Sequence, residues 1–68
     1  MKERVLPLSI KNNIIECRVE YFENEYGIIV ENVYGYINNI EYNLNATLLF
    51  HVQDLLNEEW EISRSPKL

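Results

Sequence analysis

Apolar residues recur at every second position in several short stretches between residues 4 and 44, a pattern typical of strands with one buried face. Two pairs of these stretches are separated by consecutive asparagines, Asn12-Asn13 and Asn38-Asn39. Asparagine tolerates the positive φ angles that two-residue hairpin turns require. The pattern therefore predicts two β-hairpins that turn at these asparagine pairs.

A turn at the first asparagine pair fixes the register of the first hairpin and places Leu8 opposite Cys17. One side of this hairpin is then almost wholly apolar, and the other is mostly polar. Pro7 lacks the backbone N–H that a central strand would need. The strand that contains Pro7 is therefore expected at an edge of the sheet.

The second asparagine pair fixes a second register, with Ile37 opposite Ile40. It also places Gly35 opposite Tyr42. This pairing is physically sensible, because a large ring covers the backbone that a glycine leaves exposed.

The stretch of residues 23–27 is turn-like and is expected to join the two hairpins. Two registers remain open for the strands on either side of it. One places Val19 opposite Glu31, and the other places Cys17 opposite Asn32. Either register puts a polar group on the inner face, so a bulge or an irregular middle is expected.

The last long stretch predicts an amphipathic helix over residues 46–61, with Asn45 as its N-cap. Six apolar residues fall within one arc of the helical wheel and form the expected core face. These are Leu48, Leu49, Val52, Leu55, Leu56 and Trp60.

Together these elements predict an α+β fold: a four-stranded antiparallel β-meander with one C-terminal α-helix packed on one face. Length allows a single domain, expected over residues 1–62. Residues 63–68 contain a proline and two basic residues and are expected to form a flexible C-terminal tail.

A single helix covers only one face of such a sheet, and the other face is not uniformly polar. It is expected to carry Ile28, Val30, Asn32, Tyr34 and Tyr36. One interpretation is that Val30, Tyr34 and Tyr36 bind a protein partner, with a second copy in a homodimer as the first choice. The other is that the two tyrosines merely lean on the stems of basic side chains across the sheet.

Phe50 falls outside the apolar arc of the helix and should face outward. A loop, a chain terminus or a later helix start could cover it. Alternatively, Phe50 anchors a partner protein, with Asp54 and Asn57 as a polar rim.

Asp54, Glu58 and Glu61 lie together on the polar side of the expected helix. Such a row is usually a solvated face. A second interpretation is a carboxylate array that imitates nucleic-acid phosphates and occupies a DNA- or RNA-binding protein.

Eleven acidic residues outnumber six basic ones, giving a net charge of −5. This balance argues against direct nucleic-acid binding and favours a basic or nucleic-acid-binding protein as partner. No apolar stretch approaches the length of a membrane span, and a single cysteine forms no internal disulfide, so a cytoplasmic location is expected.

The chain offers little for catalysis or for cofactor and metal binding. His51 is its only histidine and Cys17 its only cysteine, whereas metal sites usually need more of either. Its two glycines cannot make a phosphate-binding loop. No enzymatic activity, cofactor or metal site is expected.

The sequence therefore predicts a small acidic, non-enzymatic protein-interaction module. Its Asn- and Ile-rich composition is typical of AT-rich coding DNA and suggests a phage or mobile-element accessory protein that modulates a host protein. The alternatives are a nucleic-acid-mimicking inhibitor and a small structural subunit of a larger assembly.

Overall fold

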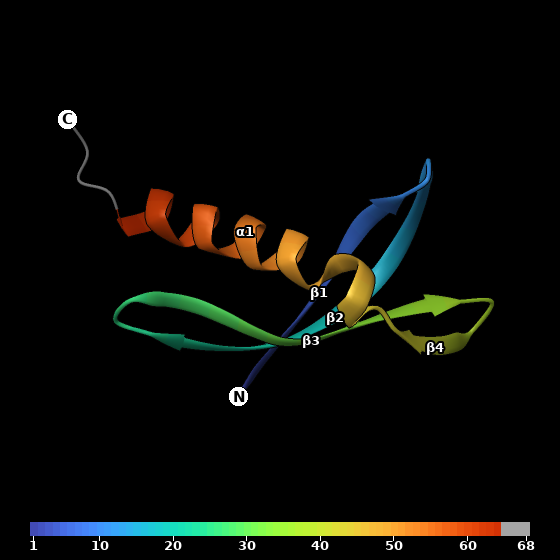
Figure 1. Ribbon diagram of the computed structural model, residues 1–68, viewed down its shortest axis with the longest axis horizontal. Helices are drawn as coiled ribbons and strands as arrows, with labels where there is room; N and C mark the ends of the chain where they lie inside the picture. The colour runs from blue at the N-terminus through green and yellow to red at the C-terminus, as the bar shows by residue number, and fades with distance from the viewer. Residues whose placement is uncertain (65–68) are drawn as a thin grey trace.

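The computed structural model describes residues 1–64 and confirms the expected α+β meander. Its four strands form one antiparallel sheet in the order β1-β2-β3-β4, and the helix α1 lies across one face of it (Figure 1). The elements are β1 (Lys2–Ile10), β2 (Asn13–Asn24), β3 (Gly27–Ile37), β4 (Ile40–Asn43) and α1 (Asn45–Arg64). As expected for a strand that contains Pro7, β1 lies at an edge of the sheet.

The first hairpin turns one residue earlier than its asparagine pair suggests. Lys11 and Asn12 have positive φ angles of 47° and 68°, and Leu8 lies opposite Ile15 rather than Cys17. The predicted register is therefore wrong by two residues. A shift of two residues leaves every side chain on its own face. The alternation of apolar residues could not reveal this shift.

The second hairpin has the predicted register, with Ile37 opposite Ile40 and Gly35 opposite Tyr42. Its turn residues Asn38 and Asn39 have φ angles of 53° and 64°, which are typical of a two-residue hairpin turn.

The pairing of β2 with β3 contains the expected irregularity, because its register shifts between Glu20 and Tyr21. Neither of the two alignments considered from the sequence is correct, since Val19 lies opposite Val33. The shift adds one unpaired residue to β3, so the side chains before it point to the opposite face of the sheet from the one that simple alternation predicts. Ile28 and Val30 consequently face the helix, although they were expected on the uncovered face; Val30 is only 5% exposed.

The core lies between α1 and the inner face of the sheet. Cys17, Val19 and Val33 from the sheet and Val52 from the helix are fully shielded from solvent. The predicted helical stripe supplies the helix side of this core, except that Leu55 lies at its margin and is exposed.

The helix begins at Asn45 and continues to Arg64, so it includes the first two residues of the expected tail. Residues 65–68 lie outside the described part of the chain. The carbonyl of Leu44 accepts the N–H groups of Thr47 and Leu48 at 3.1 and 2.8 Å. The side chain of Asn45 accepts a hydrogen bond from the N–H of Val33 at 2.7 Å. The predicted capping role of Asn45 is therefore wrong, because its side chain binds the sheet.

Candidate protein interface

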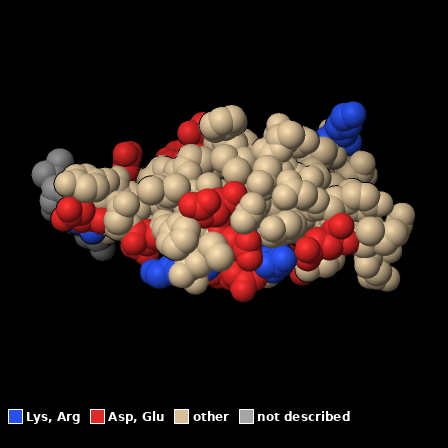
Figure 2. All heavy atoms as spheres, turned by 60° about the horizontal axis from the view of Figure 1, so that its bottom comes forward, with Lys and Arg blue, Asp and Glu red and all other residues tan. Residues whose placement is uncertain are grey.

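The side of the sheet that faces away from α1, called here the outer face, carries a mixture of charged and large apolar side chains. Figure 2 turns this side forward and shows acidic groups spread along its length, with a few basic atoms beside them and uncharged surface between them. Strand alternation and the contacts described below define its main members. These are Glu3, Val5, Ile14, Glu16, Arg18, Glu20, Phe22, Ile29, Asn32, Tyr34, Tyr36 and Glu41.

Arg18 lies at the centre of the outer face and binds carboxylates from three strands. Its Nη1 donates to Glu3 at 3.0 Å and to Glu20 at 3.1 Å, and its Nη2 donates to Glu41 at 3.3 Å. Glu3 and Glu20 lie directly opposite each other in β1 and β2, where two like charges would repel. The guanidinium between them removes this repulsion and ties three strands together.

Two tyrosines complete this cluster. The guanidinium carbon of Arg18 lies 4.6 Å from the ring centre of Tyr34, within the range of a cation–π interaction. The hydroxyl of Tyr36 is hydrogen-bonded to Glu41. Tyr34 is half-buried, whereas Tyr36 remains exposed. Tyr34 thus leans on a basic side chain, as one interpretation of the sequence expected, while Tyr36 still presents part of its ring to solvent.

The electrostatics of the cluster favour its charged forms. The Glu3 carboxylate, followed by Tyr36 and Glu41, raises the pKa of Arg18 further above its usual range. The hydrogen bond from Tyr36, together with Arg18, lowers the pKa of Glu41. Arg18 and Glu41 therefore both favour their charged forms around neutral pH.

The cluster is connected to the start of the helix by a chain of polar side chains. Glu20 accepts a hydrogen bond from Asn32 at 3.0 Å, and Asn32 accepts one from Asn45 at 3.0 Å. Asn45 also binds the backbone of Val33, so this chain of hydrogen bonds holds the start of α1 in place relative to the outer face of the sheet.

Asn45 is the first of three helical amides that bind the backbone of β3 where β4 no longer covers it. Gln53 accepts the N–H of Val30 at 2.7 Å, and Asn57 accepts the N–H of Ile28 at 2.9 Å. Sequence reasoning missed these contacts. The available signal was the placement of Gln53 and Asn57 four residues apart, beside the apolar stripe.

These amides close an edge that would otherwise expose unpaired backbone groups to another chain. Strand addition by a partner is thereby blocked along this half of β3. The outer face, whose side chains no element of residues 1–64 covers, remains open.

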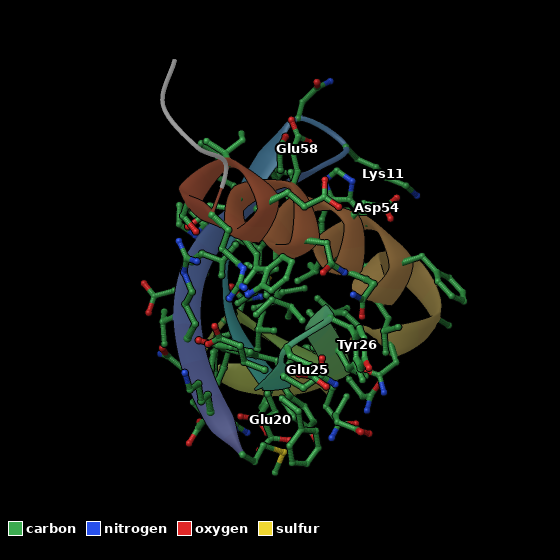
Figure 3. The ribbon with its side chains drawn as sticks, turned by 90° about the vertical axis from the view of Figure 1, so that its left-hand side faces the viewer. Lys11, Glu20, Glu25, Tyr26, Asp54 and Glu58 are labelled. Carbon is green, nitrogen blue, oxygen red and sulfur yellow. The ribbon has the colours of Figure 1, made fainter. Side chains whose placement is uncertain are left out.

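The remaining predicted site residues lie on the helix, away from the outer face. Figure 3 shows Asp54 and Glu58 projecting from α1, on the side of the molecule opposite Glu20. Phe50 is 81% exposed, and Glu61 is also exposed. Asn57 does not contribute a polar rim for Phe50, because its side chain is bound to β3. The structure thus separates the predicted site residues into two surfaces and buries Val30 between them.

Comparisons with protein-family models, with curated proteins and with solved structures found no match. Within residues 1–64, no helix is long and apolar enough to cross a membrane. In the same part of the chain, no group of three or more His, Cys, Asp or Glu residues is arranged to hold a metal ion.

Proposed function

We propose that this protein is a non-enzymatic binding module whose outer face binds a basic partner protein. The observation that carries this proposal is the combination of exposed apolar side chains with an acidic centre on one face of the sheet. Val5, Ile14, Phe22, Ile29 and Tyr36 all keep at least two-fifths of their surface exposed. Several large apolar side chains left exposed on one face mark a candidate protein-binding surface.

Charge favours a basic partner over a second copy of the chain. Glu3, Glu20 and Glu41 bind the single guanidinium of Arg18, Glu16 lies on the same outer face, and the whole chain carries a net charge of −5. Two outer faces in contact would bring carboxylates together around each Arg18. A basic protein surface would instead meet complementary charge, which speeds association and selects against wrong partners.

Affinity capture from a lysate of the source organism, followed by binding measurements with the purified captured protein, tests this proposal. Phe22→Ser and Ile29→Ser should each weaken binding about tenfold or more, as truncation of an interface anchor does. Phe50→Ser is the matched control, because it removes a phenylalanine that is 81% exposed, against 43% for Phe22, from the helix on the other side of the molecule. The proposal is wrong if Phe22→Ser and Ile29→Ser bind normally while Phe50→Ser does not.

A second candidate function is a nucleic-acid mimic that acts through the helix. Asp54, Glu58 and Glu61 form an exposed row, and no hydrogen bond or ion pair within residues 1–64 engages Asp54 or Glu58. A mimic should lose affinity steeply with added salt and after Asp54→Asn and Glu58→Gln. Binding through the outer face should depend on Phe22 and Ile29 instead. In either case, a phage or mobile-element accessory protein remains the proposed setting.

A further inference from the structure

β4 is the outermost strand on one side of the sheet (Figure 1), and all four of its residues are exposed. The helix begins just after it, at Asn45, and packs against β3 instead. The unpaired backbone groups of an edge strand are a template for pairing with another strand. The edge of β4 is therefore open to a strand from outside the chain.

The hydrogen-bonding pattern of the second hairpin shows which backbone groups of β4 are free. A two-residue turn closes on a bonded pair, here Ile37 and Ile40, and bonded pairs then alternate with unbonded ones. Leu44 is in phase with this pattern, because its N–H donates to a carbonyl of β3 at 2.8 Å. Glu41 and Asn43 lie between the bonded positions. Their backbone N–H and C=O groups therefore point away from β3, and no other element of residues 1–64 binds them.

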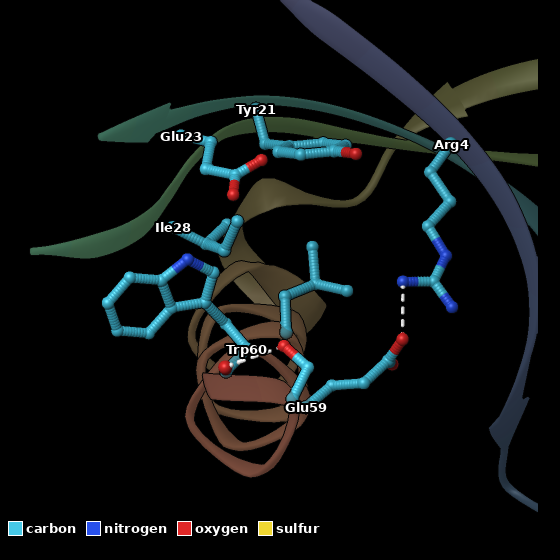
Figure 4. Close-up of a pocket in the computed structure, with 8 residues that line it drawn as sticks. Arg4, Tyr21, Glu23, Ile28, Glu59 and Trp60 are labelled. Carbon is cyan, nitrogen blue, oxygen red and sulfur yellow. Dashed lines mark hydrogen bonds and ion pairs between the residues drawn. The ribbon is translucent and has the colours of Figure 1, made fainter. Parts of the chain in front are cut away.

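The other edges of the sheet are guarded. Pro7, which has no N–H, occupies an outward-facing position of β1, because Ile10 and Asn13 form the bonded pair that closes the first hairpin. Arg4 also ties β1 to the helix, since it donates to Glu59 at 2.9 Å beside a small pocket (Figure 4). On β3, the amides of α1 take the place of a strand. The edge of β4 has neither a proline nor a covering side chain.

The inner face of the second hairpin is apolar and uncovered near its turn. Tyr42 pairs with Gly35, two residues from the buried Val33, so it lies on the same side of the sheet as the core. Ile37 and Ile40 lie on this side as well. Tyr42, Ile40 and Ile37 are 45%, 55% and 39% exposed. A strand added to β4 would cover these side chains if it brought apolar groups to the same face.

The sequence of β4 is complementary to itself in one antiparallel register. If Tyr42 lies opposite Tyr42 of a second copy, the two rings meet on the inner face. Glu41 then lies opposite Asn43 of the second copy, and each such pair exchanges two backbone hydrogen bonds. The side-chain Nδ2 of Asn43 has no partner within residues 1–64 and can donate to the Glu41 carboxylate across the pair. A register with Glu41 opposite Glu41 would instead set two like charges against each other.

We infer that the protein forms a weak symmetric dimer in which the β4 strands of two copies pair antiparallel and join their sheets into one. Each copy carries a net charge of −5, so the copies repel each other as a whole. β4 brings only the charge of Glu41 to the contact, and Arg18 offsets it. So short a strand buries less than the roughly 800 Å² per partner of a standard interface, and the dimer therefore depends on concentration.

This dimer goes beyond the proposed function and is compatible with it. Antiparallel pairing places the two copies about a two-fold axis perpendicular to the joined sheet. Both outer faces then lie on the same side of that sheet and remain open. A basic partner with two matching surfaces would bind such a dimer more tightly than a single copy.

Sedimentation equilibrium between about 10 µM and 1 mM tests the inference, because a dissociation constant in this range corresponds to a weak contact. The average mass should rise with concentration from 8.1 kDa toward twice this value. Raising the salt from about 0.05 to 0.5 M should strengthen the dimer, since salt screens the repulsion between two acidic copies. A mass that stays at the monomer value throughout would overturn the inference.

Two substitutions of the same residue isolate the backbone contact. Glu41→Pro removes the outward-facing N–H and should weaken the dimer about tenfold or more. Glu41→Gln removes the same charge but keeps the N–H, so it should still dimerise. Pro7 shows that an edge strand of this sheet accommodates proline at an outward-facing position, and the amide NMR signals report whether Glu41→Pro folds. Equal dimerisation of the two folded variants contradicts strand pairing through β4.

Cross-linking tests the register and does not depend on the proline variant. Residue 42 of each copy lies in a non-hydrogen-bonded pair, whose Cα atoms are about 4.5 Å apart, and a disulfide spans roughly 4.4–6.8 Å. Tyr42→Cys should therefore form a covalent dimer on mild oxidation, and Cys17 should not interfere, because it is fully shielded. Tyr26→Cys, at a turn residue that is 85% exposed, is the control. It should cross-link about tenfold more slowly or less, because the dimer does not bring its thiols together.

Equal cross-linking rates for the two cysteine variants would overturn the inferred register. Phe22→Ser and Ile29→Ser test the outer face and lie outside the β4 contact, so they should leave the dimer unchanged. The dimer and the proposed function can therefore fail separately.

Discussion

The side chain of Asn57 makes two hydrogen bonds with the backbone of Ile28, one as acceptor and one as donor. Its Oδ1 accepts the N–H of Ile28 at 2.9 Å, and its Nδ2 donates to the carbonyl of Ile28 at 3.0 Å. Gln53 also donates to this carbonyl, so only the N–H of Ile28 depends on Asn57 alone. The helix thus takes the place of a neighbouring strand along the part of β3 that β4 does not reach.

Asn57→Leu should lower the free energy of unfolding by about 1–3 kcal/mol, because it leaves the buried N–H of Ile28 without an acceptor. Urea denaturation measures this loss. Hydrogen exchange at Ile28 should accelerate more than exchange at Val33, whose N–H is held by Asn45. Glu58→Gln, one position along the helix, should change stability by no more than about 0.5 kcal/mol. Equal effects of the two substitutions would contradict this role of Asn57.

Gly27 lies beside the same contact and should not tolerate a side chain. Its φ angle is 139°, and a Cβ at this position would lie 2.5 Å from Asn57 Oδ1. Gly27→Ala should therefore destabilise the protein by about 1–3 kcal/mol. A double-mutant cycle with Asn57→Ala tests this contact. In the double variant the clash disappears but the backbone strain at residue 27 remains. The stability losses of the two single variants should therefore sum to more than the loss in the double variant. Strict additivity would show that Gly27 and Asn57 do not interact.

The elements of this fold could be predicted because each depends on a local pattern. Alternating apolar residues indicated the strands, the asparagine pair at Asn38 and Asn39 set one turn, and the apolar stripe identified the helix. The register of the first hairpin could not be predicted in the same way. Two registers that differ by two residues bury the same side chains, and only the choice between Lys11 and Asn13 as a turn residue separates them.

The candidate interface was predicted only in part, because a single inserted residue changed its membership. A bulge was expected between β2 and β3, but its position at Glu20 and Tyr21 depends on tertiary packing. That position moved Val30 into the core and left Tyr34 and Tyr36 outside. Arg18 was not singled out from the sequence, because Glu3 and Glu41, two of its three carboxylates, are distant in the chain and reach it only when the strands pair.

Glu41 should make the stability of the protein depend on acidic pH. Tyr36 and Arg18 lower its pKa below the usual 4.5, so the folded state favours its charged form. The resulting stabilisation is present above the unfolded-state pKa and is lost as the pH falls through the lower folded-state pKa. Glu41→Gln should therefore weaken the pH dependence of the urea midpoint in acid. Glu16→Gln should not, since Glu16 has no ion pair within residues 1–64.

Cys17 should be chemically protected and should make the protein less stable in base. Its thiol is fully shielded, and desolvation raises its pKa above the usual 9.0. The unfolded thiol then ionises first, so stability is complete below 9.0 and falls as the pH rises through the folded-state pKa.

A thiol-reactive probe should therefore label Cys17 only as fast as the chain opens, and urea should accelerate the labelling. Cys17→Ala keeps every other titrating group, so comparing its urea midpoints with those of the parent protein across pH 9.0 isolates the thiol. The variant should be less stable near neutral pH, because a smaller side chain leaves a cavity, but it should lose less stability in base. Rapid labelling of the folded parent protein, or parallel pH curves for the two proteins, would show that solvent reaches the thiol through the sheet.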